Sequence, residues 1–89
     1  MVQVTKQSVQ QWIMFDYLSK KHRFQDTINQ MERKYGMTLQ EFEKYIAAAE
    51  KEDFQQWDDN IEWTTAVEML ADTLRSIEEI KRGAIEIVE

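Results

Sequence analysis

The scarcity of helix-breaking residues limits the fold of this chain more than any other feature. The sequence has no proline, and its two glycines are Gly36 and Gly83. Proline and glycine are the strongest local interruptions of regular structure, so a chain this poor in them should be mostly helical. Its 89 residues allow one modest hydrophobic core. We therefore expect one all-α domain of three to four helices at residues 1–83, followed by a C-terminal tail at 84–89.

The clearest boundary between helices lies at Gly36. Two cations at residues 33–34 precede this glycine, as is typical of the last turn of a helix that ends in a left-handed glycine. Thr38 and Glu41 then have the spacing of a capping box, in which each side chain bonds the backbone N–H of the other residue. This pattern predicts a new helix at residues 39–50.

The remaining helices are less sharply bounded. The apolar spacing predicts a helical hairpin over residues 24–50, in front of a longer C-terminal helix. Residues 9–35 could form one helix or two, and their unusual length favours a bend near residues 19–23. Weak alternation of apolar and polar residues at both chain ends predicts short terminal strands.

The C-terminal helical segment, residues 54–82, has apolar side chains on two opposite faces. At 100° per residue one face collects a heptad-like series, consisting of Trp63, Val67, Leu70, Leu74 and Ile77. The other face collects Phe54, Trp57 and Ile61. The first series suits a core or the seam of a helical dimer, which makes a homo-oligomer our expectation. The second needs a different surface to cover it, from this chain or from a partner. A helix break at Asn60 is an open alternative.

The charge of the chain is divided unevenly along its length. Residues 1–35 carry six Lys or Arg and three Asp or Glu, whereas residues 36–89 carry five and fourteen. A net charge of −6 disfavours nucleic acid as the main partner and favours a basic protein. The basic group Lys20, Lys21 and Arg23 nevertheless supplies candidate nucleic-acid contacts, or a plain solvated cluster.

Aromatic residues and carboxylates are crowded together in the stretch that begins at residue 54. Buried aromatic anchors carry most of the energy of protein interfaces, and surrounding charges steer the partner. We predict that this stretch binds a partner, through Phe54, Trp57, Asp58, Asp59, Ile61, Glu62 and Trp63.

The sequence contains no motif for catalysis, cofactor binding or a metal. There is no cysteine, His22 is the sole histidine and lies among lysines, and no glycine-rich loop is present to hold a phosphate. Pairs of carboxylates three residues apart could share a magnesium ion, as in helical nucleotide pyrophosphohydrolases, but acidic helices produce such pairs by chance. No apolar run is long enough to cross a membrane. We expect a cytoplasmic binding protein rather than an enzyme.

Residues 32–74 resemble small acidic antitoxins of prokaryotic toxin–antitoxin modules. The similarity lies in the helix start of residues 34–43 and in an acidic, aromatic segment that follows it. The matching positions of that segment are Asp53, Trp57, Asp58, Asp59, Glu62 and Trp63. The resemblance implies a protein that folds against a cognate toxin, commonly a ribonuclease, and neutralises it by occupying its basic active cleft.

Two other functions remain open. A ribbon–helix–helix DNA-binding regulator would use residues 1–6 as its strand, and many antitoxins bind DNA to regulate their own genes. An acidic inhibitor of the phage type, which mimics DNA, would bind a nuclease by nearly the same physics as an antitoxin. Genomic context distinguishes this inhibitor from an antitoxin, because an antitoxin gene lies beside its toxin gene.

Overall fold

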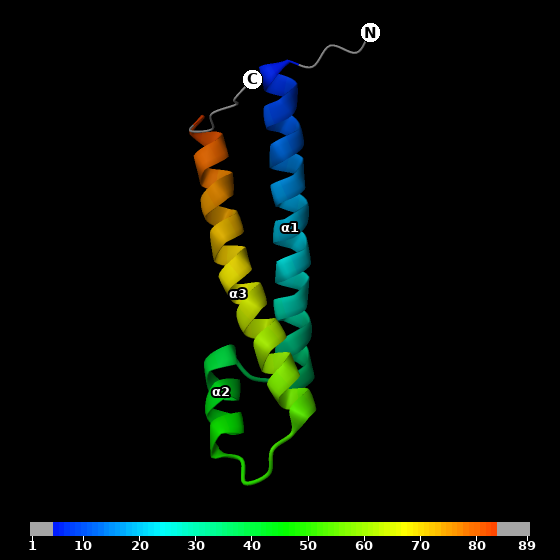
Figure 1. Ribbon diagram of the computed structural model, residues 1–89, viewed down its shortest axis with the longest axis vertical. Helices are drawn as coiled ribbons and strands as arrows, with labels where there is room; N and C mark the ends of the chain where they lie inside the picture. Colours follow the sequence, from blue (N-terminus) through cyan, green and yellow to red (C-terminus); the bar gives the residue numbers. More distant parts are fainter. Residues whose placement is uncertain (1–4, 84–89) are drawn as a thin grey trace.

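Three helices make up the described part of the chain. The computed structural model describes residues 5–83, which form α1 (Lys6–Tyr35), α2 (Leu39–Ala48) and α3 (Phe54–Lys81). α1 and α3 lie antiparallel, and α2 flanks only the end at which they are connected (Figure 1). We call this the loop end, and the opposite end, where α1 begins and α3 ends, the terminal end. The all-α prediction is confirmed.

The predicted terminal strands lie almost wholly outside the described residues. Within residues 5–83 there is no strand, and Lys6 already belongs to α1. The described residues also contain no helix that combines the length and the apolar character needed to cross a bilayer.

α1 is one continuous helix of 30 residues, so the predicted bend near residues 19–23 is wrong. That stretch contains neither a glycine nor a proline, and local contacts hold the helix together there. The Lys20 ammonium lies 3.0 Å from the Asp16 carboxylate one turn earlier, and the Ser19 hydroxyl donates to the Phe15 carbonyl over 3.0 Å. The helix also begins before residue 9, because the Thr5 hydroxyl caps it by accepting from the Ser8 N–H.

The boundary between α1 and α2 has the predicted chemistry. Gly36 adopts the left-handed conformation at φ 64°, and its N–H donates to the Glu32 carbonyl over 2.7 Å. The Thr38 hydroxyl accepts from the Glu41 N–H over 3.2 Å, and the Glu41 carboxylate accepts from the Thr38 N–H over 3.1 Å. The capping box is therefore complete. α2 ends at Ala48, two residues short of the predicted end.

α3 runs without a break through the segment in which a second start was considered. Asp53 caps it, since its carboxylate accepts from the N–H groups of Gln55 and Gln56 at 3.0 and 3.3 Å. The helix therefore begins at Phe54 rather than at Asn60. It ends at Lys81, and Gly83 follows in the left-handed conformation at φ 73°.

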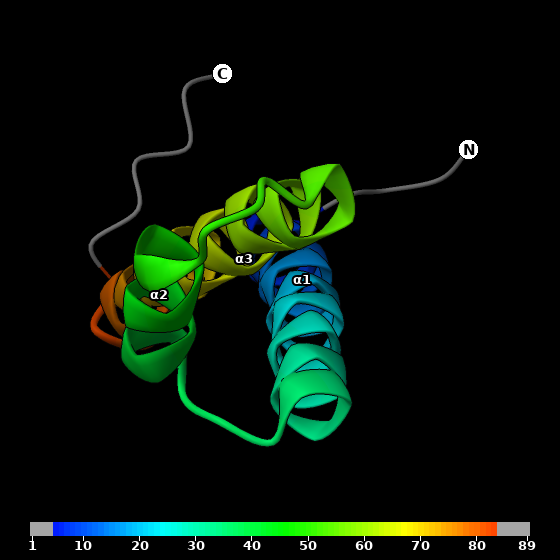
Figure 2. The same cartoon turned by 90° about the horizontal axis from the view of Figure 1, so that it is seen from below.

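The hydrophobic core is concentrated at the loop end, where all three helices meet. Figure 2, viewed along the molecule from that end, shows the helices arranged around a common centre. The Tyr35 and Phe42 rings lie 4.2 Å apart between centroids, and Phe42 stacks on Trp63 at 5.5 Å. The buried core cluster draws two residues from each helix, namely Ile28, Met31, Phe42, Ile46, Trp63 and Ala66.

The apolar series predicted on α3 is divided between the interior and the surface. Trp63 and Ile77 are buried, whereas Val67 and Leu74 are 39% and 41% exposed. The buried positions of α3 continue instead through Ala66 and Thr73, which lie three residues beyond Trp63 and four residues before Ile77 and are seven residues apart. A seven-residue repeat of buried positions is typical of a helix that packs lengthwise along another helix. The helix that α3 packs along is α1.

Candidate functional site

The first two turns of α3 place the predicted partner-binding residues on different sides of the helix. Phe54, Trp57 and Ile61 are 78%, 43% and 64% exposed. They recur at spacings of three and four and therefore form one stripe, which faces away from the core. Asp58 is exposed beside this stripe. We call Phe54, Trp57, Asp58 and Ile61 the acidic–aromatic patch.

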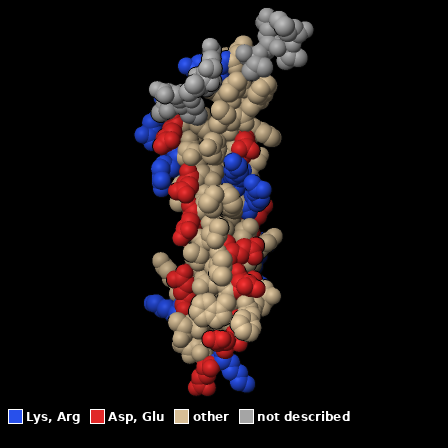
Figure 3. All heavy atoms as spheres, in the orientation of Figure 1, with Lys and Arg blue, Asp and Glu red and all other residues tan. Residues whose placement is uncertain are grey.

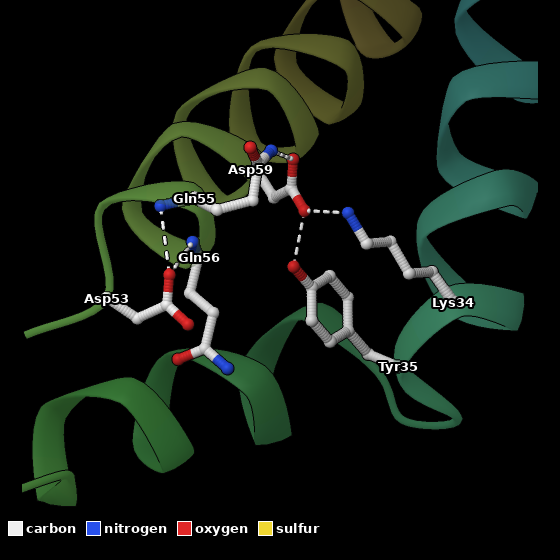
Figure 4. A network of polar contacts seen from close by, with 6 residues as sticks. All are labelled: Lys34, Tyr35, Asp53, Gln55, Gln56 and Asp59. Atoms are coloured by element: carbon white, nitrogen blue, oxygen red, sulfur yellow. Dashed lines mark hydrogen bonds and ion pairs between the residues drawn. The ribbon is translucent and has the colours of Figure 1, made fainter.

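Asp59 does not face a partner, contrary to the prediction. Its side chain is 5% exposed, and its carboxylate is held between the two ends of the long helices (Figure 4). One oxygen accepts from the Lys34 ammonium over 2.6 Å and from the Tyr35 hydroxyl. The other accepts from the Gln55 side-chain amide over 3.0 Å. Because Lys34 and Tyr35 belong to α1, their hydrogen bonds to Asp59 link the end of α1 to the first turns of α3.

The Asp59 network shifts the pKa values of its members. Burial of Asp59 opposes ionisation, but the hydrogen bonds from Lys34, Tyr35 and Gln55 outweigh it and lower the pKa of this carboxyl. The hydrogen bond to Asp59 raises the pKa of Lys34. Burial, together with the bond to the Asp59 carboxylate, raises the pKa of Tyr35. At neutral pH the network therefore holds a carboxylate, an ammonium and a neutral phenol.

Trp63 is also unavailable to a partner, contrary to the prediction. It is 1% exposed and stacks on Phe42 in the core. Its position follows from the helical period, because it lies four residues beyond Asp59 on the inner side of α3. An indole placed there is a core residue of the loop end.

Glu62 is exposed but lies outside the patch. It borders a shallow pocket between α1 and α3, to which Arg23 and Phe24 also contribute. Glu62 therefore lies at the rim of this pocket, on a different side of α3 from the aromatic stripe.

A shallow hollow adjoins the patch and extends it toward α2. Its lining consists of Tyr45, Ala49 and residues 51–56, which include Phe54. Tyr45 is 52% exposed and was not among the predicted site residues. The sequence could have indicated this exposure. Phe42 and Ile46 define the buried stripe of α2, and the helical spacing places Tyr45 outside that stripe.

The basic residues proposed as nucleic-acid contacts lie together on α1, away from the patch. Lys20 pairs with Asp16, and its ammonium lies 5.1 Å from the centre of the Tyr17 ring. The guanidinium of Arg23 lies 5.8 Å from the centre of the Phe24 ring. Lys21, which lies between these two residues in the sequence, is partly buried. Contact of these residues with nucleic acid stays a prediction.

The patch combines exposed aromatic and aliphatic side chains with one exposed carboxylate. Within residues 5–83 no three acidic or histidine side chains lie close enough together to hold a metal ion. Comparison of the chain with known protein families, with characterised sequences and with solved structures finds no match.

Proposed function

We propose that this protein is an antitoxin that neutralises a basic protein toxin, such as a ribonuclease, by stoichiometric binding through the acidic–aromatic patch. The observation that supports this proposal is the exposure of three large apolar side chains in one stripe of α3, beside a carboxylate. Phe54, Trp57 and Ile61 lie on the side of α3 that faces away from the core. Exposed aromatic residues that form one contiguous patch are typical of an interaction site.

The acidic charge of the loop end supports a basic partner. Residues 29–63 carry nine Asp or Glu and four Lys or Arg. Figure 3 shows acidic side chains predominating over the lower half of the face in view, where α2 and the start of α3 lie. A ribonuclease must present cations to the phosphates of RNA, so its active cleft would attract this end of the molecule.

The apolar residues and the carboxylates would contribute differently to the complex. Complete burial of one large apolar side chain stabilises a complex by about 1.5–3 kcal/mol, judged by the area removed from water. Exposed ion pairs at the rim contribute roughly 0.2–1 kcal/mol each. We therefore assign the affinity mainly to Phe54, Trp57 and Ile61, and the rate of encounter mainly to Asp58 and its acidic neighbours.

Co-expression with the protein encoded by the adjacent gene tests the proposal. The neighbouring protein should arrest growth when it is expressed alone, and this chain should restore growth and co-purify with it. Trp57→Ala should weaken the complex more than Asp58→Ala does. Trp12→Ala is the matched control, because Trp12 is an exposed tryptophan on another helix and should leave the complex intact.

Two results would contradict the proposal. One is a neighbouring protein that neither arrests growth nor binds this chain. The other is a complex that withstands the loss of both Trp57 and Ile61. A complex with a nuclease that is not encoded nearby, and that duplex DNA displaces, would instead support the DNA-mimicking inhibitor.

A further inference from the structure

One long face of the α1–α3 pair is covered by α2 at the loop end and by no other described element beyond it. α2 has 10 residues and α1 has 30, so their lengths are about 15 and 45 Å at 1.5 Å per residue. Figure 1 shows that α2 flanks only the lower part of the pair. α2 can cover at most its own length of the pair, so at least about 30 Å of α1 extends beyond it.

The residues of this face follow from the contacts that α2 makes. Ile28 of α1 packs in the core cluster with residues of α2, and steps of seven residues from it lead to Lys21 and Met14 on the same side of α1. On α3, Trp63 stacks on Phe42 of α2, and Val67 lies one turn beyond Trp63. The same helical periods add Leu18 beside Met14 and Leu74 beyond Val67. We call Met14, Leu18, Lys21, Val67 and Leu74 the uncovered face.

The uncovered face is apolar and incompletely buried. Leu18, Val67 and Leu74 are 38%, 39% and 41% exposed, although each is a large aliphatic residue. Lys21 is the one charged member of the face. The uncovered face therefore continues, toward the terminal end, the side of the α1–α3 pair that α2 covers at the loop end.

The size of this face is close to what a stable dimer requires. Two neighbouring helices, each about 10 Å across, present on the order of 600 Å² in flat projection over a length of about 30 Å. The relief of side chains makes the accessible area larger. A standard interface buries about 800 Å² per partner, so an interface formed by this face would lie at the smaller end of stable assemblies.

The charge around the face favours a second copy of this chain as the occupant. Residues 6–28 and 64–83 together carry seven Lys or Arg and six Asp or Glu, so the terminal half is nearly neutral. Two such halves can approach without the repulsion that the acidic loop ends would cause. Residues 6–28 carry four Lys or Arg and two Asp or Glu, whereas residues 64–83 carry three and four. The charges of two copies can therefore complement each other.

We propose that this protein is a homodimer in which two copies pack their uncovered faces together in opposite directions. α2 occupies the same side of the pair at the loop end, so two copies aligned in the same direction would bring their α2 helices into collision. A two-fold axis across the long axis avoids this collision and places the acidic loop ends at opposite extremities. Each acidic–aromatic patch then stays accessible, but the dimer does not depend on the function proposed for that patch.

The oligomeric state in solution tests the choice of face. Light scattering after gel filtration should give the mass of a dimer for the native chain, and Leu74→Glu should raise the dimer dissociation constant at least tenfold. Met69→Glu is the matched control, because Met69 is equally exposed at 41% on the same helix but lies outside the uncovered face. Circular dichroism should show that both variants remain helical. A monomeric native chain, or equal weakening by the two substitutions, would overturn the proposal.

Cross-linking tests the relative direction of the two copies. The chain has no cysteine, so a single introduced cysteine reports one position without interference. Leu18 lies near the middle of the uncovered stretch, where the two-fold axis would bring it close to its counterpart. Leu18→Cys should therefore cross-link efficiently with a short thiol reagent, and Tyr45→Cys at the loop end should not. Efficient cross-linking through Tyr45→Cys alone would show that the copies associate by their loop ends and would overturn this arrangement.

Discussion

The carboxylate of Asp59 joins the end of α1 to the beginning of α3. It accepts hydrogen bonds from Lys34 and Tyr35 on one side and from Gln55 on the other. An unpaired buried carboxylate would destabilise the fold, but a carboxylate with three donors has its lost hydration replaced. No buried side-chain nitrogen or oxygen lacks a hydrogen-bond partner within residues 5–83. Asp59 therefore specifies how the two long helices meet at the loop end.

Replacement of Asp59 should reveal this internal role. Asp59→Asn removes the negative charge that Lys34 and Tyr35 bond, and hydrogen bonds to a charged group contribute about 1.5–3 kcal/mol. We expect a loss of about 2 kcal/mol in the free energy of unfolding, measured by urea denaturation. Asp58→Asn is the matched control, since Asp58 is exposed and its replacement should change stability by less than about 0.5 kcal/mol. Equal losses would contradict the assignment.

The same network predicts how stability depends on pH. The pKa of Asp59 is lowered by folding, so its contribution is present above the unfolded value of about 4 and is lost as pH falls through the folded value. The pKa values of Lys34 and Tyr35 are raised, so their contribution is present below about pH 10 and is lost as pH rises through the folded values. Stability should therefore fall at both extremes.

Urea midpoints of the native chain and of Asp59→Asn, compared across pH, isolate the part of this dependence that the network supplies. Glu41 titrates in the same acidic window, because its hydrogen bonds with Thr38 lower its pKa. The native chain and the variant share that effect, so the difference between their curves reports Asp59 and its partners. The difference should shrink below about pH 4 and above about pH 10. A constant difference at all pH values would show that the substitution acts by packing instead.

At the scale of the helices, the connection between α1 and α2 depends on the backbone of Gly36. This residue is left-handed at φ 64°, and a Cβ added to it would meet no atom within 4 Å. Gly36→Ala therefore tests backbone conformation without a steric clash. We expect a loss of about 1 kcal/mol in the free energy of unfolding, which is the cost of placing an L-residue in this region.

Gly83→Ala provides the matched control for this prediction. Gly83 is also left-handed, at φ 73°, and likewise has open space around its α-carbon. It follows the last turn of α3, where local unwinding can relieve the strain without opening the core. Its substitution should therefore cost less than that of Gly36. If Gly83→Ala were the more destabilising change, the Gly36 turn would not be the connection that organises the loop end.

At the scale of the whole molecule, charge and apolar surface are separated along a body 62 Å long. The loop end has the core, the acidic charge and the acidic–aromatic patch. The terminal end is nearly neutral and has the uncovered face. The two proposed partners, a basic protein and a second copy, would therefore bind different ends and would not compete.

Thermal unfolding at several protein concentrations checks this view of the whole molecule. A second copy that binds only the folded state raises the melting temperature with concentration, since a tenfold increase in concentration adds about 1.4 kcal/mol to the stability of a dimer. Leu74→Glu should remove this dependence, and Met69→Glu should keep it. A melting temperature that stays constant for the native chain would show that the monomer is the stable unit.

Local patterns in the sequence were sufficient to predict the fold class and one of its boundaries. The scarcity of glycine and proline predicted helices, and the capping chemistry at Gly36 and Thr38 depends on neighbouring residues alone. Helical periodicity also separated Phe54 and Trp57 from Trp63, because the side that a residue occupies on a helix depends only on its spacing. These features could be read from the chain because each is a short-range property.

The roles of Asp59, Val67 and Leu74 depend on contacts between segments that are distant in the sequence. A carboxylate on the inner side of α3 is stable there because Lys34 and Tyr35, more than twenty residues earlier, come within hydrogen-bonding distance of it. Val67 and Leu74 have the spacing of core residues but remain exposed, because α2 is too short to cover them. Periodicity places a side chain on a face of its helix, but the packing of the three helices decides whether that face is buried.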